Sequence, residues 1–470
     1  MENTTIVAIA TPIGNAGVGI IRLSGSDSLS IVSRCFTPQN PIGKPHKKIK
    51  NSEKTPLVFK PRTATLATLE TPTFTDQVIV IHFPAPNSFT GEDIVEIQAH
   101  GGAFLLQQIV EHLTTLGATP AAPGEFSRRA FMNGKLSLDQ AEAIIETIHA
   151  ESQTHLNATS KVLSGELREK LFNIEAEIIH TLAQLEATLD NPEADIMHVT
   201  TETIQLSIKF INDELNTLLQ TADTGRIIAN GINVAVLGKP NVGKSSLFNA
   251  LLNHDRSIVT DIAGTTRDTI TESIHYRGLR IIFHDTAGVH KVVGGNGNRP
   301  EILGIERTKE IVKNADIALA IFDASKKPTP EDDEIVKLTK NKLTLIALNK
   351  NDLDTCKNHL PLWTKLVWNK KYIHTSALSG ENVDKLKELI YDTVTKDKLT
   401  TKSTDIILTN QRHIRELQEA TRQLDSLTEK TLDCIAQDLT TALHHIGNVT
   451  GTNASEAVID EIFSRFCLGK

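Results

Sequence analysis

The sequence predicts a multidomain protein with three parts: an α+β N-terminal domain, an all-α helical domain, and an α/β domain inserted into the helical one. Residues 1–133 mix short apolar runs with proline and glycine, as α+β domains do. Residues 139–190 contain no proline and are rich in Ala, Leu, Glu and Gln at helical spacing, and this spacing returns in residues 411–447. Between them, residues 232–252 read as strand, glycine-rich loop and helix.

We place the domain boundaries where the composition changes. The N-terminal domain covers residues 1–133, the helical domain covers 134–226 and 395–470, and the α/β domain covers 227–394. The polar, Thr- and Lys-rich segment 396–404 is interpreted as a connector. We interpret the helices on both sides of the insertion as one helical domain, because amphipathic helices must bury their apolar stripes against one another.

The segment from Gly238 to Ser245 fits the phosphate-binding pattern G-x-x-x-x-G-K-[ST]. The apolar run 232–237 before it is expected to form a buried strand, and residues 246–252 after it are expected to begin a helix. Glycines let backbone N–H groups turn toward phosphates, and the helix N-terminus adds a positive dipole end. We therefore expect Lys244 to reach the β- and γ-phosphates and Ser245 to bind Mg²⁺.

Three further motifs follow apolar runs and narrow the nucleotide to GTP. Residues 285–288 (Asp-Thr-Ala-Gly) offer a carboxylate for Mg²⁺ and a glycine for close approach to the γ-phosphate. Residues 349–352 (Asn-Lys-Asn-Asp) offer a carboxylate that can accept two hydrogen bonds from guanine, and adenine has no such donor pair. Ser376 and Ala377 end another strand and are expected to back the base. In open α/β sheets, ligands bind beyond the carboxyl ends of the strands, where all these motifs lie.

A switch segment is expected at residues 258–268, between the phosphate loop and Asp285. Thr266 is our choice for the threonine that closes over the γ-phosphate and completes the Mg²⁺ shell. The residues expected to bind GTP are Asn241, Val242, Gly243, Lys244, Ser245, Ser246, Thr260, Asp261, Ile262, Ala263, Gly264, Thr265, Thr266, Asp285, Thr286, Ala287, Gly288, Asn349, Lys350, Asp352, Ser376 and Ala377.

Val289 follows Gly288, at the point where small GTPases such as Ras use glutamine to orient the attacking water. Valine cannot hydrogen-bond to water, so catalysis must be completed in another way. A cation near the β- and γ-phosphates could replace an arginine finger. Asn241 offers a side-chain oxygen for such a cation, and the loop 260–265 offers carbonyls. A carboxylate elsewhere could position the water.

These motifs and both ends of the chain resemble the MnmE (TrmE) family of tRNA-modification GTPases, over nearly the whole length. The matching stretches are residues 5–12, 19–25, 86–93, Glu96, 100–102, 123–127, 130–135 and 139–143, with the ending Cys467-Leu468-Gly469-Lys470 similar to the family's C-x-G-K. Together these stretches are more specific than the GTPase motifs alone.

The resemblance implies that the N-terminal domain is similar to folate-binding domains and binds a 5-formyl- or 5,10-methylene-tetrahydrofolate as one-carbon donor. Arg22, Glu96, Lys135 and Lys470 fall at the positions that contact folate. Basic groups suit the glutamate tail of folate, and a carboxylate suits the donors of the pterin ring. Cys467 is a candidate catalytic residue, with a contact to folate or simple packing as the alternatives.

The resemblance also assigns metal ligands. Ser245 and Thr266 match the magnesium ligands. The residues that match the potassium ligands are Asn241, Thr260, Ile262 and Thr265. Family members use potassium in place of an arginine finger and dimerise their G domains across the nucleotides. The water-positioning glutamate is expected at Glu301, with Glu306 as the alternative, because the preceding stretch 290–300 is longer and richer in glycine than the family pattern.

By resemblance, the chain is a homodimer that adds an aminomethyl-type substituent to C5 of the tRNA wobble uridine. The reaction implies an FAD- and NADH-dependent partner of the MnmG (GidA) type, in a heterotetramer or larger assembly, since the sequence shows no second dinucleotide fingerprint. The alternative is a ribosome-assembly or regulatory GTPase. A basic, KH-like C-terminal domain would favour that alternative, and we find none in the sequence.

Composition bounds the remaining possibilities. The chain has 470 residues and a formal net charge of −8, so a tRNA contact must use a local patch or a partner. No apolar run approaches the ~18 residues that would suggest a membrane span. Four widely spaced cysteines, at positions 35, 356, 434 and 467, argue against a disulfide framework or a zinc site. With an N-terminus unlike a signal peptide, these features predict a cytoplasmic protein.

Overall fold

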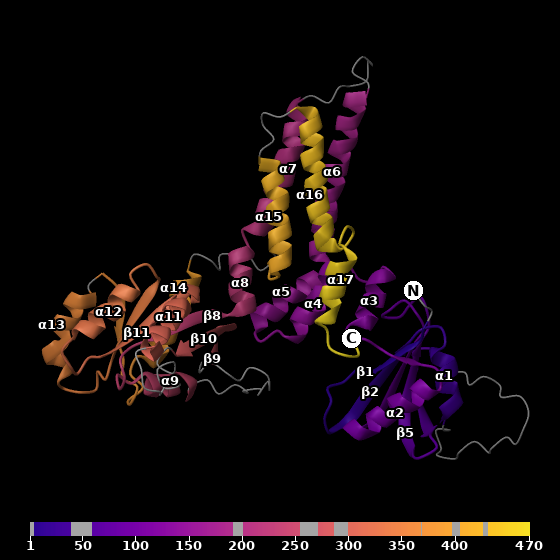
Figure 1. The fold of residues 1–470 in the computed structure, drawn as a ribbon, viewed down its shortest axis with the longest axis horizontal. Helices are drawn as coiled ribbons and strands as arrows, with labels where there is room; N and C mark the ends of the chain where they lie inside the picture. The colour runs from indigo at the N-terminus through magenta and orange to yellow at the C-terminus, as the bar shows by residue number, and fades with distance from the viewer. Residues whose placement is uncertain are drawn as a thin grey trace, which may run out of the picture. The chain divides into compact units, whose positions relative to one another are not determined.

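The computed structural model describes residues 4–38, 59–190, 201–253, 271–285, 299–367, 369–396, 405–425 and 431–470. The chain divides into two compact units. The first comprises Met1–Glu146, Val162–His198 and Glu429–Lys470, and the second comprises Thr147–Lys161 and Val199–Thr428. Each unit is described by itself below, with the element labels of Figure 1.

The first unit contains a mixed sheet whose strand order is β3-β4-β5-β6-β2-β1-β7. Its strands are β1 (Ile6–Ile9), β2 (Ala16–Ser24), β3 (Phe36–Pro38), β4 (Thr65–Glu70), β5 (Thr75–Phe83), β6 (Ile94–Gly101) and β7 (Thr119–Pro120). The central pairs β1–β2, β2–β6 and β5–β6 are antiparallel. Buried and partly exposed residues alternate along β5 and β6, so the two faces of the sheet have different environments.

Helices cover both faces of this sheet. α1 (Ser28–Cys35) and α2 (Ala103–Thr115) pack on one face, where their apolar side chains share a core with Val7, Ile21 and Leu23. On the other face, Phe126 of α3 (Glu125–Met132) packs against Ile6 and Ala8. The alternation of strand side chains therefore brings the polar residues of β2 and β6 to the same face as α3.

The rest of the first unit is helical. It contains α4 (Leu138–Ile148), α6 (Glu166–Asp190), α16 (Leu432–Thr450) and α17 (Glu456–Ser464). α6 and α16 run side by side (Figure 1). α17 packs on α3, and Phe463 and Phe466 share an apolar cluster with Leu138 of α4. The C-terminal end of the chain is thus held by the N-terminal third of the sequence.

The second unit contains a sheet with strand order β13-β12-β11-β8-β10-β9. Its strands are β8 (Ile232–Leu237), β9 (Thr271–Tyr276), β10 (Leu279–Asp285), β11 (Ile317–Asp323), β12 (Thr344–Asn349) and β13 (Lys371–His374). All neighbouring pairs are parallel except the β9–β10 hairpin at one edge. Every residue of β11 and β12 is buried, as expected for central strands of a sheet with helices on both faces.

The helices of the second unit are α5 (Gln153–Leu163), α7 (Thr201–Leu219), α8 (Ala222–Asn230), α9 (Lys244–Asn253), α11 (Arg299–Asn314), α12 (Pro330–Leu338), α13 (Cys356–Val367), α14 (Val383–Thr395) and α15 (Gln411–Asp425). α9 and α14 share one core with the sheet, and α13 contributes Trp363 to a core on the opposite face. α7 packs along α15.

The β9–β10 hairpin contacts the segment around α5 through a hydrogen bond and an ion pair. The Thr154 hydroxyl donates to the carbonyl of Gly278 at 2.5 Å, and Arg280 forms an ion pair with Glu151. Ala158 on the same helix is buried in the core of the α/β sheet. α5 therefore packs as part of the α/β unit, although it lies about 70 residues before β8 in the sequence.

The predicted fold class is confirmed: an α+β N-terminal domain, paired long helices, and an α/β domain with a phosphate loop after its first strand. Within the described ranges, no helix combines the length and the apolar character that crossing a membrane requires.

Candidate nucleotide and N-terminal sites

The phosphate loop lies at the carboxyl end of β8 and leads into α9, as its motif predicts. Gly243 has φ +93°, and a Cβ built there would lie 2.3 Å from Nδ2 of Asn349. A side chain at this position would therefore push the guanine-recognition motif away from the loop. Asn241 also has a left-handed backbone, with φ +65°.

The side chain of Lys244 folds back onto the phosphate loop and contacts its backbone. Its Nζ donates to the carbonyls of Gly238 and Lys239, at 2.7 and 2.8 Å. Burial lowers the pKa of Lys244, and the nearby charge of Asp285 acts in the opposite direction. Asp285 ends β10 opposite Val236 of β8, so the predicted Mg²⁺-binding carboxylate lies on the strand next to the loop. Ser245 and Ser246 are exposed in the first turn of α9.

The structure brings the segments predicted to recognise guanine together with the phosphate loop. Asn349 donates through Nδ2 to the carbonyl of Val242 at 3.0 Å and accepts through Oδ1 from the Ala377 amide at 3.1 Å. The Ser376 hydroxyl donates to Asp352 at 2.6 Å, which holds the carboxylate expected to bind the base. This geometry gathers the carboxyl ends of β8, β12 and β13 around one position.

Part of the predicted site falls outside the described residues: Thr260, Asp261, Ile262, Ala263, Gly264, Thr265, Thr266, Thr286, Ala287 and Gly288. Of the two candidates for the water-positioning glutamate, Glu301 and Glu306, both lie in α11, and Glu306 is exposed.

Sequence reasoning missed two residues that lie beside the predicted nucleotide site. Asp323 ends β11 and accepts a hydrogen bond from Lys350 at 2.7 Å. Lys239, inside the loop motif, donates to Thr329 and Asp332 at the start of α12, at 2.7 Å each. A cavity of about 270 Å³ beside the phosphate loop is lined by all four of Lys239, Asp323, Thr329 and Asp332. The rule that singled out Asp285, a carboxylate at a strand end, could also have found Asp323.

In the N-terminal domain, Arg22 and Glu96 face each other across β2 and β6. Arg22 donates through Nε and Nη2 to Oε1 of Glu96, at 3.0 and 2.8 Å. The guanidinium lies 5.7 Å from the ring centre of Phe89 and 5.8 Å from that of Phe126, within range of cation–π attraction. Two of the four residues expected to bind folate are therefore in direct contact.

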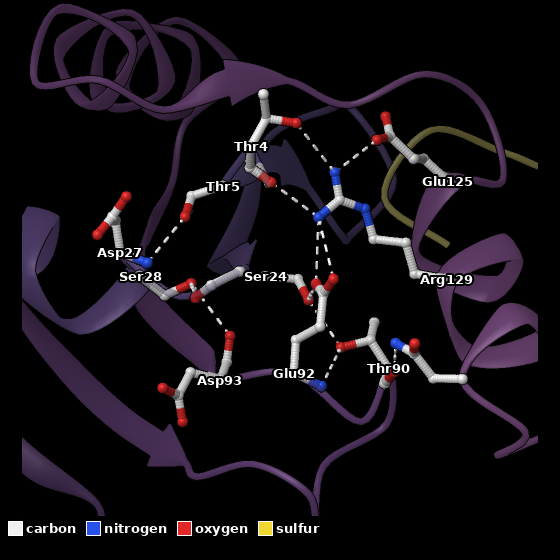
Figure 2. Close-up of polar contacts among 12 residues, drawn as sticks. Thr4, Thr5, Ser24, Asp27, Ser28, Thr90, Glu92, Asp93, Glu125 and Arg129 are labelled. Carbon is white, nitrogen blue, oxygen red and sulfur yellow. Dashed lines mark hydrogen bonds and ion pairs between the residues drawn. The ribbon is translucent and has the colours of Figure 1, made fainter. Parts of the chain in front are cut away.

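A polar network in the same domain holds Thr90 and Glu92 (Figure 2), which follow Phe89 in the sequence. Arg129 of α3 donates to the carbonyl of Thr4 at 2.8 Å, to Glu92 at 3.1 Å and to Glu125 at 2.9 Å. Glu92 also accepts from the Ser24 hydroxyl at 2.7 Å. Arg129 thus joins the start of the chain, the loop before β6 and α3 around one guanidinium.

The other two residues expected to bind folate lie on segments that border this site. Lys135 passes beside Gly91, where an added Cβ would lie 3.2 Å from Lys135 Cε. At the C-terminus, Gly469 has φ +86°, and an added Cβ would lie 2.2 Å from the carbonyl of Ile9 at the end of β1. β1 is also the strand that pairs with Arg22 of β2. Cys467, two residues before Gly469, is exposed.

Comparison with known proteins identifies relatives of the whole chain. Residues 5–135 match the family model described as GTP-binding protein TrmE N-terminus, and residues 138–467 match that of the MnmE helical domain. A protein named tRNA modification GTPase MnmE from Lactobacillus gasseri is 36% identical over 99% of this chain and 98% of its own. Proteins of the same name from Carboxydothermus hydrogenoformans and Alkaliphilus oremlandii are 36% and 35% identical over 99% or more of both chains.

Some solved structures are also similar to part of the chain. Era from Aquifex aeolicus bound to GDP.AlF4⁻ is 26% identical, with 43% of this chain and 69% of that chain covered and a TM-score of 0.29. The G domain of the FeoB iron transporter of T. maritima is 24% identical, with 34% and 98% covered and a TM-score of 0.25. The full-length relatives and the two family models, taken with the described fold, show that the chain is a GTP hydrolase of tRNA modification and belongs to the MnmE family.

Proposed function

We propose that this GTPase works with an FAD-dependent partner of the MnmG type to add a (carboxymethyl)aminomethyl group to C5 of the tRNA wobble uridine. The added carbon comes from a 5-formyl- or 5,10-methylene-tetrahydrofolate. The observation that carries the proposal is the Arg22–Glu96 pair between two aromatic rings, with the C-terminal tail packed on the adjacent strand.

The N-terminal residues fit the chemistry of a folate. Phe89 is 37% exposed and offers a ring for stacking, and Glu96 offers a carboxylate to the pterin donors. Lys135 and Lys470 supply positive charge for the glutamate tail. Cys467 is exposed, two residues before the Gly469 that packs against the end of β1, so its sulfur would be available to a one-carbon unit bound at this site. The bound folate supplies that carbon, and this chain's residues bind and orient it.

The G domain hydrolyses GTP with oxygen ligands for two cations. Ser245 begins the helix after β8, and Asp285 ends the strand that pairs with β8; both present the hard oxygens that Mg²⁺ prefers. Ser245 and Thr266 would hold Mg²⁺, and Asn241, Thr260, Ile262 and Thr265 would hold K⁺. Lys244 binds the β- and γ-phosphates, and Glu301 orients the attacking water. Potassium held there would supply the positive charge that an arginine finger provides in other GTPases.

A homodimer is part of the proposal. Ile13, Val18 and Phe104 are exposed by 77%, 56% and 76%. They come from the loop before β2, from β2 and from the first turn of α2. Because β2 pairs with β6 just before α2 begins, these segments meet at one end of the sheet. Exposed large apolar side chains at one place mark a contact surface.

We also propose the domain boundaries 1–133, 134–226 with 395–470, and 227–394, and a cytoplasmic location.

Nucleoside mass spectrometry of tRNA tests the proposal, with cells that carry or lack this gene. We expect C5-aminomethyl uridines to disappear without the gene and to return with the wild-type chain. The variants Arg22→Ala and Glu96→Ala should not restore them, whereas Arg34→Ala should, since Arg34 is an exposed arginine of the same domain. An unchanged profile in cells without the gene would reject the modification role and favour a ribosome-assembly or regulatory GTPase.

A further inference from the structure

Asp323 is a buried carboxylate at the nucleotide edge of the sheet, on the strand between β8 and β12. It ends β11 and is 7% exposed. Its Oδ2 accepts from Lys350 Nζ at 2.7 Å, and its Oδ1 accepts from the hydroxyl and the amide of Ser325, at 2.5 and 3.1 Å. Burial acts to raise the pKa of Asp323, but these hydrogen bonds outweigh it and the pKa lies below its ordinary value. Asp323 is therefore a fixed negative charge.

Lys350 belongs to the guanine-recognition motif and makes a second contact. Its Nζ also donates to the carbonyl of Asn241 in the phosphate loop, at 2.9 Å. Its backbone is left-handed, with φ +66°, and its carbonyl accepts from the Cys356 thiol at 3.0 Å. One ammonium group thus connects the phosphate loop, the end of β11 and the base-recognition loop.

A free lysine side chain does not hold such a position by itself. Its flexible stem loses rotamer entropy when it is ordered. A hydrogen bond to a charged group is about twice as strong as one to a neutral carbonyl. The carboxylate of Asp323 is the stronger of the two partners. Lys326, the other lysine near it, lies 3.9 Å away and is 75% exposed, so it competes weakly.

We propose that Asp323 is a positioning residue for guanine nucleotides, which holds the Lys350 ammonium against the Asn241 carbonyl and so fixes the spacing between the base-recognition loop and the phosphate loop. A nucleotide contacts both loops at once, so its affinity depends on that spacing. Asp323 itself acts through Lys350 and does not contact the reacting phosphate.

Asp323→Asn in the full chain tests this role, because asparagine keeps the size and loses the charge. We expect a fluorescent GDP analogue to dissociate about tenfold faster and KM for GTP to rise by a similar factor. The value of kcat should stay within about twofold, since Lys244 and Ser245 are untouched. Asp333→Asn is the matched control: it removes a carboxylate 2.6 Å from Lys337 on α12 and should change neither quantity.

A double-mutant cycle separates positioning from a structural role. In a Lys350→Met background, Asp323→Asn should add less than about a twofold change, because its partner is already gone. The same tenfold loss in that background would overturn the proposal. An unchanged KM and dissociation rate together with a lower unfolding temperature would also overturn it, and would make Asp323 a residue of the turn alone.

If Asp323→Asn fails to fold, Ser325→Ala provides a second test of the same proposal. It leaves the charge in place and removes one hydrogen bond that orients the carboxylate. We expect a smaller change in the same direction, about threefold in the dissociation rate, and its disappearance in the Lys350→Met background. A loss that persists in that background would again contradict the proposal.

Discussion

Lys244 shows how the fold prepares one side chain for a ligand. Its ammonium is held by two loop carbonyls and is largely removed from water. Burial lowers the pKa of Lys244, which means that folding disfavours the charged form. A phosphate would reverse this balance by supplying negative charge. At this site, stability without nucleotide and affinity for nucleotide therefore oppose each other.

Lys244→Met should separate these two quantities. We expect the variant without nucleotide to unfold at no lower temperature than the wild type, because a buried charge is gone, while GTP affinity falls at least about a hundredfold. The two quantities are measured by thermal unfolding and by titration with a fluorescent GTP analogue. A large loss of stability without nucleotide would contradict this account.

The same variant gives a pH dependence with a defined sign. Because the pKa of Lys244 is lowered from 10.5 in the folded chain, the unfolded chain binds this proton more tightly. The stability of the wild type should therefore rise relative to Lys244→Met as the pH increases through the lowered pKa toward 10.5. Chemical unfolding of both proteins at a series of alkaline pH values measures the difference in their free energies of unfolding. A difference that falls or stays constant as the pH rises would refute this prediction.

In the N-terminal domain, Arg129 is a largely buried charged side chain whose partners are carboxylates. Its side chain is 12% exposed, and its removal leaves Glu92 and Glu125 without their cation. We expect Arg129→Met to destabilise this unit by about 2–3 kcal/mol, somewhat less than a fully buried pair. Arg465→Met is the control: its partner Glu461 lies at 2.6 Å, but the arginine is 69% exposed, so the loss should stay below about 1 kcal/mol. Equal losses in denaturant unfolding would contradict this contrast.

At the scale of elements, the contact between α3 and α17 places the C-terminal tail. Gly124 precedes α3 with φ +69°, and a Cβ there would lie 2.3 Å from the carbonyl of Phe463. Arg128 of α3 also forms an ion pair with Asp460 of α17 at 3.1 Å. Such a close approach requires glycine, and it fixes the helix that leads to Cys467 and Lys470.

Gly124→Ala should therefore displace α17 and reduce tRNA modification at least about tenfold, while GTP hydrolysis stays within about twofold. Gly134→Ala is a matched control. Its φ of +67° imposes the same backbone strain, and the described residues place no atom within 4 Å of the added Cβ. Equal loss of modification in both variants would show that strain, not displacement of the tail, is responsible. Nucleoside mass spectrometry and phosphate release measure the two activities.

At the scale of the whole molecule, the proposed cation and dimer are tested together. If K⁺ replaces an arginine finger, GTP hydrolysis should run at least about tenfold faster in K⁺ than in Na⁺. Because the G domains would pair across the nucleotides, the specific activity should also rise with protein concentration. Phosphate release in matched K⁺ and Na⁺ buffers over a dilution series measures both. Equal rates in the two salts would reject the cation, and rates independent of concentration would reject pairing.

The sequence predicted the fold well because its signals are local. The proline-free run 139–190 and the apolar runs at 232–237 and 343–348 carry their signal in neighbouring residues. Arg22 and Glu96 were named only by resemblance, and their contact with each other was not predicted, since 74 residues separate the two side chains. Asp323 and Arg129 were missed for a related reason: their roles depend on partners that strand pairing and helix packing bring close.

Because α5 packs on the β9–β10 hairpin, the unit that folds together does not coincide with the inserted segment of the sequence. Residues 227–394 carry every predicted GTPase motif, yet the sheet also buries Ala158, and Thr154 satisfies the Gly278 carbonyl. A fragment excised at those boundaries would lack both residues, which would expose the part of the core that Ala158 covers and leave the Gly278 carbonyl without this donor. The minimal stable fragment for recombinant work should therefore include a tethered copy of residues 147–161.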